Sequence, residues 1–204
     1  MILKNQAETV KSLGKIMSIW AHPDDETFTA AGIMHLAIKN GQEVICVTAT
    51  KGEAGSQNEQ KWPLSRIAEI RETELSRALT IIGINKHHWL GYKDGLCENV
   101  DKKQAANKIS KLIEEYEPDS ILTFGKDGMT GHSDHCCVSC WVDEALEISG
   151  LKSKVFHAVH TIDQYHKYLK YMDKELDIFF NIDEPPIVEV QDCDIYLELD
   201  DALK

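Results

Sequence analysis

Apolar runs of strand length alternate along the chain with longer segments that carry apolar residues at helical spacing. This pattern predicts strands at residues 16–21, 44–49, 87–90, 120–124 and 154–159. It predicts helices at residues 28–39, 63–82, 102–116 and 134–148. The strand segments are continuously apolar rather than alternating, which is typical of a parallel sheet covered on both faces by helices. We therefore expect an α/β fold, a Rossmann-like three-layer sandwich with a mostly parallel central sheet.

The length and continuity of this pattern favour one domain. A chain of 204 residues can bury a sizeable core, and no internal repeat, low-complexity tract or interdomain linker interrupts it. We expect a single domain over residues 1–204. Beyond Thr161 the pattern blurs, so the order of the last elements stays open. In such folds the ligand crevice lies at the carboxyl ends of the strands.

Charge and hydropathy bear on the partners that the chain can have. With 22 basic against 34 acidic side chains, the formal net charge is −12. Such a surface repels phosphate backbones, so we expect no nucleic-acid partner. No apolar run approaches the ~18–20 residues that a membrane span needs. The first residues, Met1–Gln6, lack the pattern of a secretory signal, so we expect a cytoplasmic location. A homo-oligomer stays open.

Two polar clusters follow two of the predicted strands. His22-Pro23-Asp24-Asp25-Glu26 comes directly after the first strand, and Gly131-His132-Ser133-Asp134-His135 comes after the fourth. Taken singly, each cluster is explained by an aspartate or serine that caps the following helix. Taken together, at the same edge of a parallel sheet, the two clusters favour a shared site.

The residue types of these clusters suit metal-dependent hydrolysis. Two histidines and one carboxylate, with an open position for water, form a recognised hydrolytic zinc site, and Fe²⁺ or Co²⁺ would fit the same donors. Metal coordination lowers the pKa of water from about 15.7 toward ~7. A carboxylate beside that water can act as general base, and a further histidine can stabilise the oxyanion or protonate the leaving amine. These parts predict an amide hydrolase with one Zn²⁺ per chain.

Five motifs between Lys15 and Val159 stand in a consistent order. They are Ala21-His22-Pro23-Asp24-Asp25-Glu26, Thr50-Lys51-Gly52-Glu53-Ala54-Gly55, Arg71 with Glu74, Leu90-Gly91-Tyr92-Lys93-Asp94-Gly95, and Thr130-Gly131-His132-Ser133-Asp134-His135. In these motifs the sequence resembles the PIG-L/LmbE-like deacetylases. These zinc-dependent enzymes mostly remove the acetyl group from substrates that contain N-acetylglucosamine.

The resemblance implies a role for each matching residue of the first and last motifs. It implies that His22, Asp25 and His135 hold the metal ion and that Asp24 is the general base. The implied reaction is removal of the N-acetyl group from a small N-acetylated amino sugar by metal-activated water.

Three further roles follow from the same resemblance. His132 is expected to stabilise developing charge and to act as a general acid, with Asp134 as its orienting partner. Arg71 matches a family arginine that reaches the substrate. From spacing alone, an ion pair of Arg71 with Glu74 at i+3 is equally favoured.

The sequence departs from the family pattern in two places. Some members carry a tyrosine that assists the oxyanion where this chain has Thr130. Many members also continue into a final helix that contains a lysine, a histidine and a glutamine. This sequence stops at Leu203-Lys204, near the start of that helix, so either the protein is short or the sequence is truncated.

A different metal site is conceivable at the cysteines of the last predicted helix. Cys136, Cys137 and Cys140 would join His132 and His135 in a structural zinc site, or Cys137 and Cys140, at CxxC spacing, would form a redox pair. No second CxxC supports the zinc site, and the position of the thiols inside a helix favours packed side chains. Cys46, within an apolar strand, is expected to be buried.

Two further functions stay open. One is a metal-dependent amidase that acts on another amide, such as a thiol conjugate. The other is a non-catalytic Rossmann-like module that binds a sugar or a nucleotide. No Gly-x-Gly-x-x-Gly follows the first strand, which counts against the nucleotide-binding module.

Overall fold

A five-stranded sheet forms the centre of the computed structural model, which describes residues 6–55, 59–176, 178–179 and 186–197. Its strands are β1 (Ile16–Trp20), β2 (Val44–Thr50), β3 (Lys86–Tyr92), β4 (Ser120–Phe124) and β5 (Lys154–Ala158). They lie in the order β3-β2-β1-β4-β5, and each neighbouring pair is parallel. The predicted parallel central sheet is confirmed.

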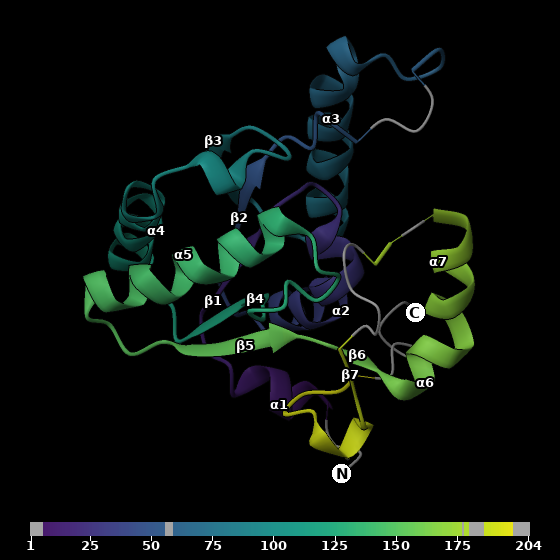
Figure 1. Cartoon of the computed structure of the whole chain (residues 1–204). Coiled ribbons are helices and arrows are strands. Elements are labelled where there is room, and N and C mark those ends of the chain that lie inside the picture. The colour runs from purple at the N-terminus through teal and green to yellow at the C-terminus, as the bar shows by residue number, and fades with distance from the viewer. Residues whose placement is uncertain (1–5, 56–58, 177, 180–185, 198–204) are drawn as a thin grey trace.

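Helices cover both faces of this sheet (Figure 1). On one face α1 (Gln6–Lys11) packs against α2 (Asp25–Lys39), which packs against α3 (Leu64–Ile82). On the other face α4 (Lys102–Tyr116) packs against α5 (Ser133–Ser149). Because the chain crosses from β3 to the other side of β1 before it forms β4, right-handed crossovers place these two groups of helices on opposite faces. The predicted three-layer sandwich is confirmed.

Most element boundaries agree with the hydrophobic pattern. α4 and β4 have the predicted bounds, and Gly83 ends α3 in a left-handed conformation with φ of 98°. α2 begins at Asp25 rather than Phe28, because the N–H of Thr27 already donates to the carbonyl of Asp24 at 2.9 Å. β3 extends beyond its predicted end, because Tyr92 pairs with Thr50 after a register shift.

The elements that hydropathy did not place are short. Besides α1 they are η1 (Cys97–Asn99), β6 (His160–Thr161), α6 (Ile162–Gln164), the π-helix η2 (Tyr165–Leu169), α7 (Lys170–Leu176), β7 (Ile187–Val188) and η3 (Val190–Asp192). β6 and β7 pair in a separate parallel ladder. The place where a final family helix would begin lies outside the described residues.

The centre of the sheet carries the core and positions the site. β1, β2 and β4 are buried along their whole length, and Cys46 is buried as predicted. Trp20 and Phe124 meet edge to face at 5.0 Å between ring centroids. The connections of β1 and β4 run to opposite sides of the sheet, and the ligand crevice of such a fold lies at this switch point. Within the described ranges no helix is long and apolar enough to cross a membrane.

Candidate metal and active site

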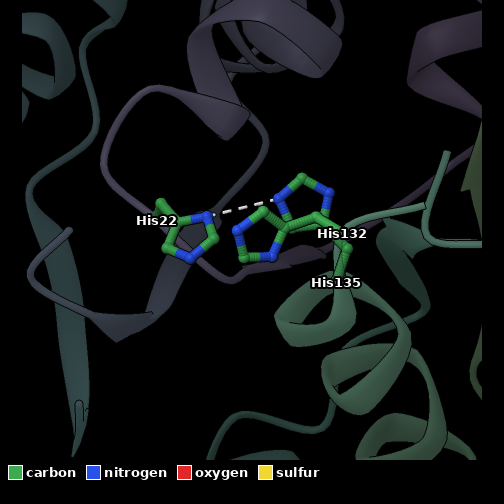
Figure 2. A group of neighbouring side chains, drawn as sticks. All are labelled: His22, His132 and His135. Atoms are coloured by element: carbon green, nitrogen blue, oxygen red, sulfur yellow. Dashed lines mark hydrogen bonds between the residues drawn. The ribbon is translucent and has the colours of Figure 1, made fainter. Parts of the chain in front are cut away.

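The two predicted clusters meet at the carboxyl ends of β1 and β4. His22 lies between β1 and α2, and His135 lies in the first turn of α5. Both are buried, and His22 Nδ1 lies 3.2 Å from His135 Nε2. Figure 2 shows that the rings of His22, His132 and His135 gather at one point, from segments far apart in the chain.

A carboxylate completes the predicted set of donors. Asp25 Oδ1 lies 3.4 Å from His135 Nε2, and Asp25 Oδ2 lies 3.7 Å from His22 Nδ1. The main-chain N–H of His22 donates to Asp25 Oδ2 at 2.8 Å and so orients the carboxylate. Ligands at about 2.0–2.1 Å from a tetrahedral zinc ion lie roughly 3.3–3.4 Å from one another. The 3.2 Å between the two histidine nitrogens and the 3.4 Å from Asp25 Oδ1 to His135 Nε2 are close to this spacing, whereas the contact of Asp25 with His22 is longer and involves the other oxygen.

The imidazole rings of His22 and His135 each use one nitrogen for hydrogen bonds, which leaves the other nitrogen for a cation. His22 Nε2 lies 2.9 Å from Asp94 Oδ1 and 3.1 Å from Asp134 Oδ2, so this nitrogen carries the proton that it donates. His135 Nδ1 lies 3.0 Å from the carbonyl of Gly128 and donates to it. His22 Nδ1 and His135 Nε2 therefore face each other, and either a proton or a metal ion between them would stabilise this arrangement.

The acidic surroundings favour positive charge at the same point. Burial opposes protonation of His22, but the hydrogen bonds to Asp134 and Asp94 outweigh it and raise the pKa of His22 to about 10. Burial and the charge of His22 lower the pKa of His135 to about 3. His22 thus holds the proton and His135 stays neutral, and a metal ion would supply the positive charge in place of that proton.

The carboxylate of Asp134 lies differently from the expectation. It was expected to orient His132, but it accepts hydrogen bonds from His22 Nε2 and from the main-chain N–H groups of Gly95 at 2.8 Å and Cys97 at 3.1 Å. The link to His132 runs instead from the Asp134 main-chain N–H to His132 Nδ1, at 3.2 Å. The reason is topological, because α5 leaves β4 beside the end of β1, where His22 lies.

Asp94 was not assigned a role from the sequence, although it stands in one of the quoted motifs. It follows β3, its Oδ1 contacts His22, and its Oδ2 accepts from the main-chain N–H of Ala54 at 2.9 Å. His22, Asp94 and Asp134 form a group whose donor atoms lie within 4.8 Å of one another. Its position in the sequence could have identified Asp94 as a site residue, since it follows a predicted strand that ends at the same edge of the sheet as β1 and β4.

His132 lies beside the two candidate ligands. Its ring centroid is 4.7 Å from that of His22 and 5.0 Å from that of His135. These three histidines also form a group with donor atoms within 4.8 Å. Because His132 Nδ1 accepts from Asp134, the neutral ring carries its proton on Nε2, which makes that atom a donor. Burial and the charge of His22 lower the pKa of His132.

Asp24 adopts a backbone conformation that side chains rarely occupy. Its φ is 122°, and its main-chain N–H donates to Glu26 Oε2 at 3.2 Å. Arg71 Nη2 forms an ion pair with Asp24 Oδ2 at 2.6 Å. Burial and the charge of Asp25 raise the pKa of Asp24 to about 6, against the lowering effect of Arg71. Strain of this kind gathers at functional sites.

Arg71 joins α3 to the loops after β1 and β2. Besides Asp24, it donates to the carbonyl of Pro23 at 2.6 Å and to that of Gly52 at 3.1 Å. Gly52 has φ of 64°, and a Cβ there would lie 2.4 Å from Arg71 Nη1. The guanidinium thus pairs with Asp24, far away in the chain, and not in the alternative i+3 ion pair with Glu74.

The second cluster holds one more polar contact. Thr130, which stands where some family members have tyrosine, places its hydroxyl 3.3 Å from His135 Nδ1. In this structure the threonine therefore contacts the buried side of a candidate ligand.

The cysteines of α5 do not form a metal site in the described part of the chain, where no candidate donor group includes a thiol. Cys136 and Cys137 are half-buried, whereas Cys140 is exposed, so the expectation of packed thiols is wrong for Cys140. Burial raises the pKa of Cys136, and it raises that of Cys137 to about 11. Reactive redox thiols have lowered pKa values, which disfavours a redox pair.

Comparison with known proteins identifies the family. Residues 17–146 match the family model described as PIG-L: GlcNAc-PI de-N-acetylase, and the chain belongs to this family. A 1D-myo-inositol 2-acetamido-2-deoxy-alpha-D-glucopyranoside deacetylase of Mycobacterium sp. (strain KMS) is 30% identical over 142 residues, which cover 59% of this chain and 46% of the relative. The chain thus spans about half the length of that relative.

One further relative and one solved structure are also similar to this chain. A probable N-acetyl-alpha-D-glucosaminyl L-malate deacetylase 2 of Bacillus anthracis is 31% identical over 153 residues, covering 74% of this chain and 67% of the relative. The solved structure of N,N'-diacetylchitobiose deacetylase from Pyrococcus horikoshii has a TM-score of 0.65 at 20% identity, covering 87% of this chain and 75% of that one. The similarity to this solved structure shows a common fold.

Proposed function

We propose that this chain, acting as one domain, is a metal-dependent deacetylase that hydrolyses the N-acetyl group of an N-acetylglucosamine-type substrate. The observation that carries the proposal is the convergence of His22 Nδ1, His135 Nε2 and the Asp25 carboxylate at 3.2–3.7 Å, with Asp24 next to them in the chain. Membership of the PIG-L family and the named activities of the mycobacterial and Bacillus relatives support this class of reaction.

The proposed ligands of the metal ion are His22, Asp25 and His135. Two imidazoles and one carboxylate suit Zn²⁺, and the same donors suit Fe²⁺ or Co²⁺. When bound, such an ion polarises an amide carbonyl and lowers the pKa of water from about 15.7 toward ~7.

Two side chains beside the ligands are proposed to move protons. Arg71 engages Asp24 Oδ2, so Oδ1 is the atom proposed to take the proton of the attacking water. His132 Nε2–H is proposed to stabilise the carbonyl oxygen as charge develops on it and to donate to the leaving amine. Arg71 is proposed to contact the sugar, because Nε–H and the second Nη1–H of its guanidinium take no part in its hydrogen bonds to Pro23, Gly52 and Asp24.

Acetate release from N-acetylglucosamine and from a small panel of its conjugates tests the proposal. Activity should be lost with a chelator and restored with zinc. Asp24→Ala should lower kcat about 10²–10⁴-fold, the usual contribution of general acid–base catalysis, while the metal content stays unchanged. Metal analysis of protein purified without oxygen distinguishes zinc from iron.

Two results would contradict the proposal. Affinity for sugars without turnover in the zinc-loaded protein would identify a binding module. Normal turnover by an Asp24→Ala variant that retains its metal would remove Asp24 from the mechanism.

A further inference from the structure

A cleft of about 330 Å³ opens between α2 and α3. Asp24 and Arg71 are part of its lining, whereas the proposed ligands His22, Asp25 and His135 are not. The cleft is therefore a separate space that shares a wall with the proposed catalytic site. Its volume lies in the range of small-molecule pockets, about 300–1,000 Å³.

Glu26, Thr27 and Glu74 are the other polar residues of the lining, and the rest of it is apolar. Ile67 and Ile70 of α3 face the cleft together with two large aromatic side chains, Phe28 and Trp62. Phe28 is 78% exposed and Trp62 is 41% exposed, so both still have apolar surface that a bound group would remove from water. Exposed aromatic side chains beside an apolar cleft are typical of a binding site. The cleft suits an apolar group.

The proposed reaction decides which part of a substrate reaches the cleft. The acyl group that is removed is acetyl, which is far smaller than about 330 Å³. The other side of the amide carries the sugar, whose amide-bearing carbon is bonded to the anomeric carbon. A substituent on the anomeric carbon can therefore extend past Asp24 and Arg71, with the guanidinium donors of Arg71 beside the sugar oxygens.

We propose that the cleft binds an apolar substituent, an aryl or alkyl group, on the anomeric carbon of the amino-sugar substrate. The proposal rests on the proposed deacetylase function and adds to it the class of glycoside that the enzyme prefers. Burial of one phenyl ring corresponds to a preference of roughly 10- to 100-fold.

The test compares acetate release from methyl and phenyl glycosides of N-acetylglucosamine, in both anomeric forms, by the zinc-loaded protein. For at least one anomer, kcat/KM of the phenyl glycoside should exceed that of the methyl glycoside about 10-fold or more. Trp62→Ala and Ile70→Ser should bring this ratio close to one. Ile81→Ser, at an 80% exposed position near the end of α3 that does not line the cleft, is the matched control and should keep the ratio.

A ratio close to one in the unmodified chain overturns the proposal. A gain that follows longer N-acyl chains instead of the anomeric group also overturns it, because the cleft then holds the acyl group.

Calorimetry measures the binding of the phenyl and methyl glycosides to the metal-free protein. It therefore tests the cleft independently of whether the protein is a deacetylase. If no glycoside is deacetylated, the deacetylase is rejected. In that case, phenyl glycoside binding about 10-fold tighter than methyl, and lost in Trp62→Ala, still supports the cleft as the site of the apolar group. Equal binding of the two glycosides rejects both proposals.

Discussion

The main-chain N–H of Asp24 donates to Glu26 Oε2 at 3.2 Å, and Glu26 is fully buried. Glu26 Oε1 accepts in turn from the hydroxyl of Thr27 at 2.7 Å. With φ of 122°, Asp24 is in a conformation that costs of order 1–3 kcal/mol and needs its surroundings to hold it. Glu26 therefore positions the proposed general base through the backbone of Asp24.

This contact predicts unequal effects of two substitutions. Glu26→Ala removes the acceptor and should lower kcat roughly 10- to 100-fold, as expected for a small misplacement of a catalytic group. Glu26→Gln keeps an acceptor oxygen and should retain most of the rate. The measurements are kcat and metal content, the latter staying constant in both variants. Equal losses in the two variants would show that the bond to Asp24 is not what matters at Glu26.

The contact between Asp134 and His22 predicts a role in metal binding. Carboxylates that orient a ligating histidine typically contribute 10- to 100-fold to metal affinity, so Asp134→Asn should weaken zinc binding by about this factor. Asp143→Asn, on the same helix and away from the site, is the matched control. The measurement is zinc affinity by competition with a chromophoric chelator. Unchanged affinity with a lowered kcat would favour the original expectation, in which Asp134 acts through His132.

His87 predicts a loss of stability in mild acid. Its Nε2 lies 3.0 Å from the Thr48 hydroxyl, and burial together with the charge of His88 lowers the pKa of His87 from 6.5 to about 4. Below pH 6.5 the unfolded chain takes up a proton that the folded chain refuses, so the free energy of unfolding should fall between about pH 6.5 and pH 4.

Denaturant titrations at pH 7 and pH 5 measure this fall. His87→Gln should reduce it, because the uncharged amide has no proton to take up. His157→Gln, at an exposed position on β5, serves as the control and should behave as the unmodified chain does. The same fall in all three proteins would assign the acid sensitivity to other groups.

A side chain at Gly52 is expected to impair substrate binding in addition to straining the backbone. Gly52 and Gly41 have φ of 64° and 79°, but a Cβ on Gly52 would meet Arg71 at 2.4 Å, whereas one on Gly41 would meet nothing within 4 Å. Alanine at either position should cost about 1–2 kcal/mol of backbone strain and lower Tm by a few degrees. Only Gly52→Ala should also displace Arg71 and raise KM several-fold. Equal KM values for the two variants would exclude Arg71 from substrate binding.

The sequence predicts structural features that depend on residues close together in the chain better than contacts between residues far apart in it. The bounds of α4 and β4 followed from hydrophobic spacing, because α4 buries positions that recur every three to four residues and β4 is buried at every residue. The short elements after Thr161 contain too few residues for a period to emerge. The meeting of the two histidine clusters was also predictable, since the carboxyl ends of parallel strands share one edge.

The partners of individual side chains were not predictable in this way. The family resemblance pairs Asp134 with His132, yet the Asp134 carboxylate contacts His22, which is 112 positions away. The resemblance gives no role to Asp94, whose carboxylate also contacts His22. The positive φ of Asp24 depends on contacts with Glu26 and Arg71 that only the folded chain provides.

The span between His22 and His135 also bears on folding. The two residues are 113 positions apart, on the segments that leave the neighbouring strands β1 and β4. A metal ion shared by them would be a reversible cross-link between the half of the sheet that contains β1, β2 and β3 and the half that contains β4 and β5. Because such an ion binds the folded chain far better than the unfolded one, free metal at 1,000 times its Kd adds about 4 kcal/mol to stability. The concentration of the metal would then set how long the protein persists, as well as how fast it works.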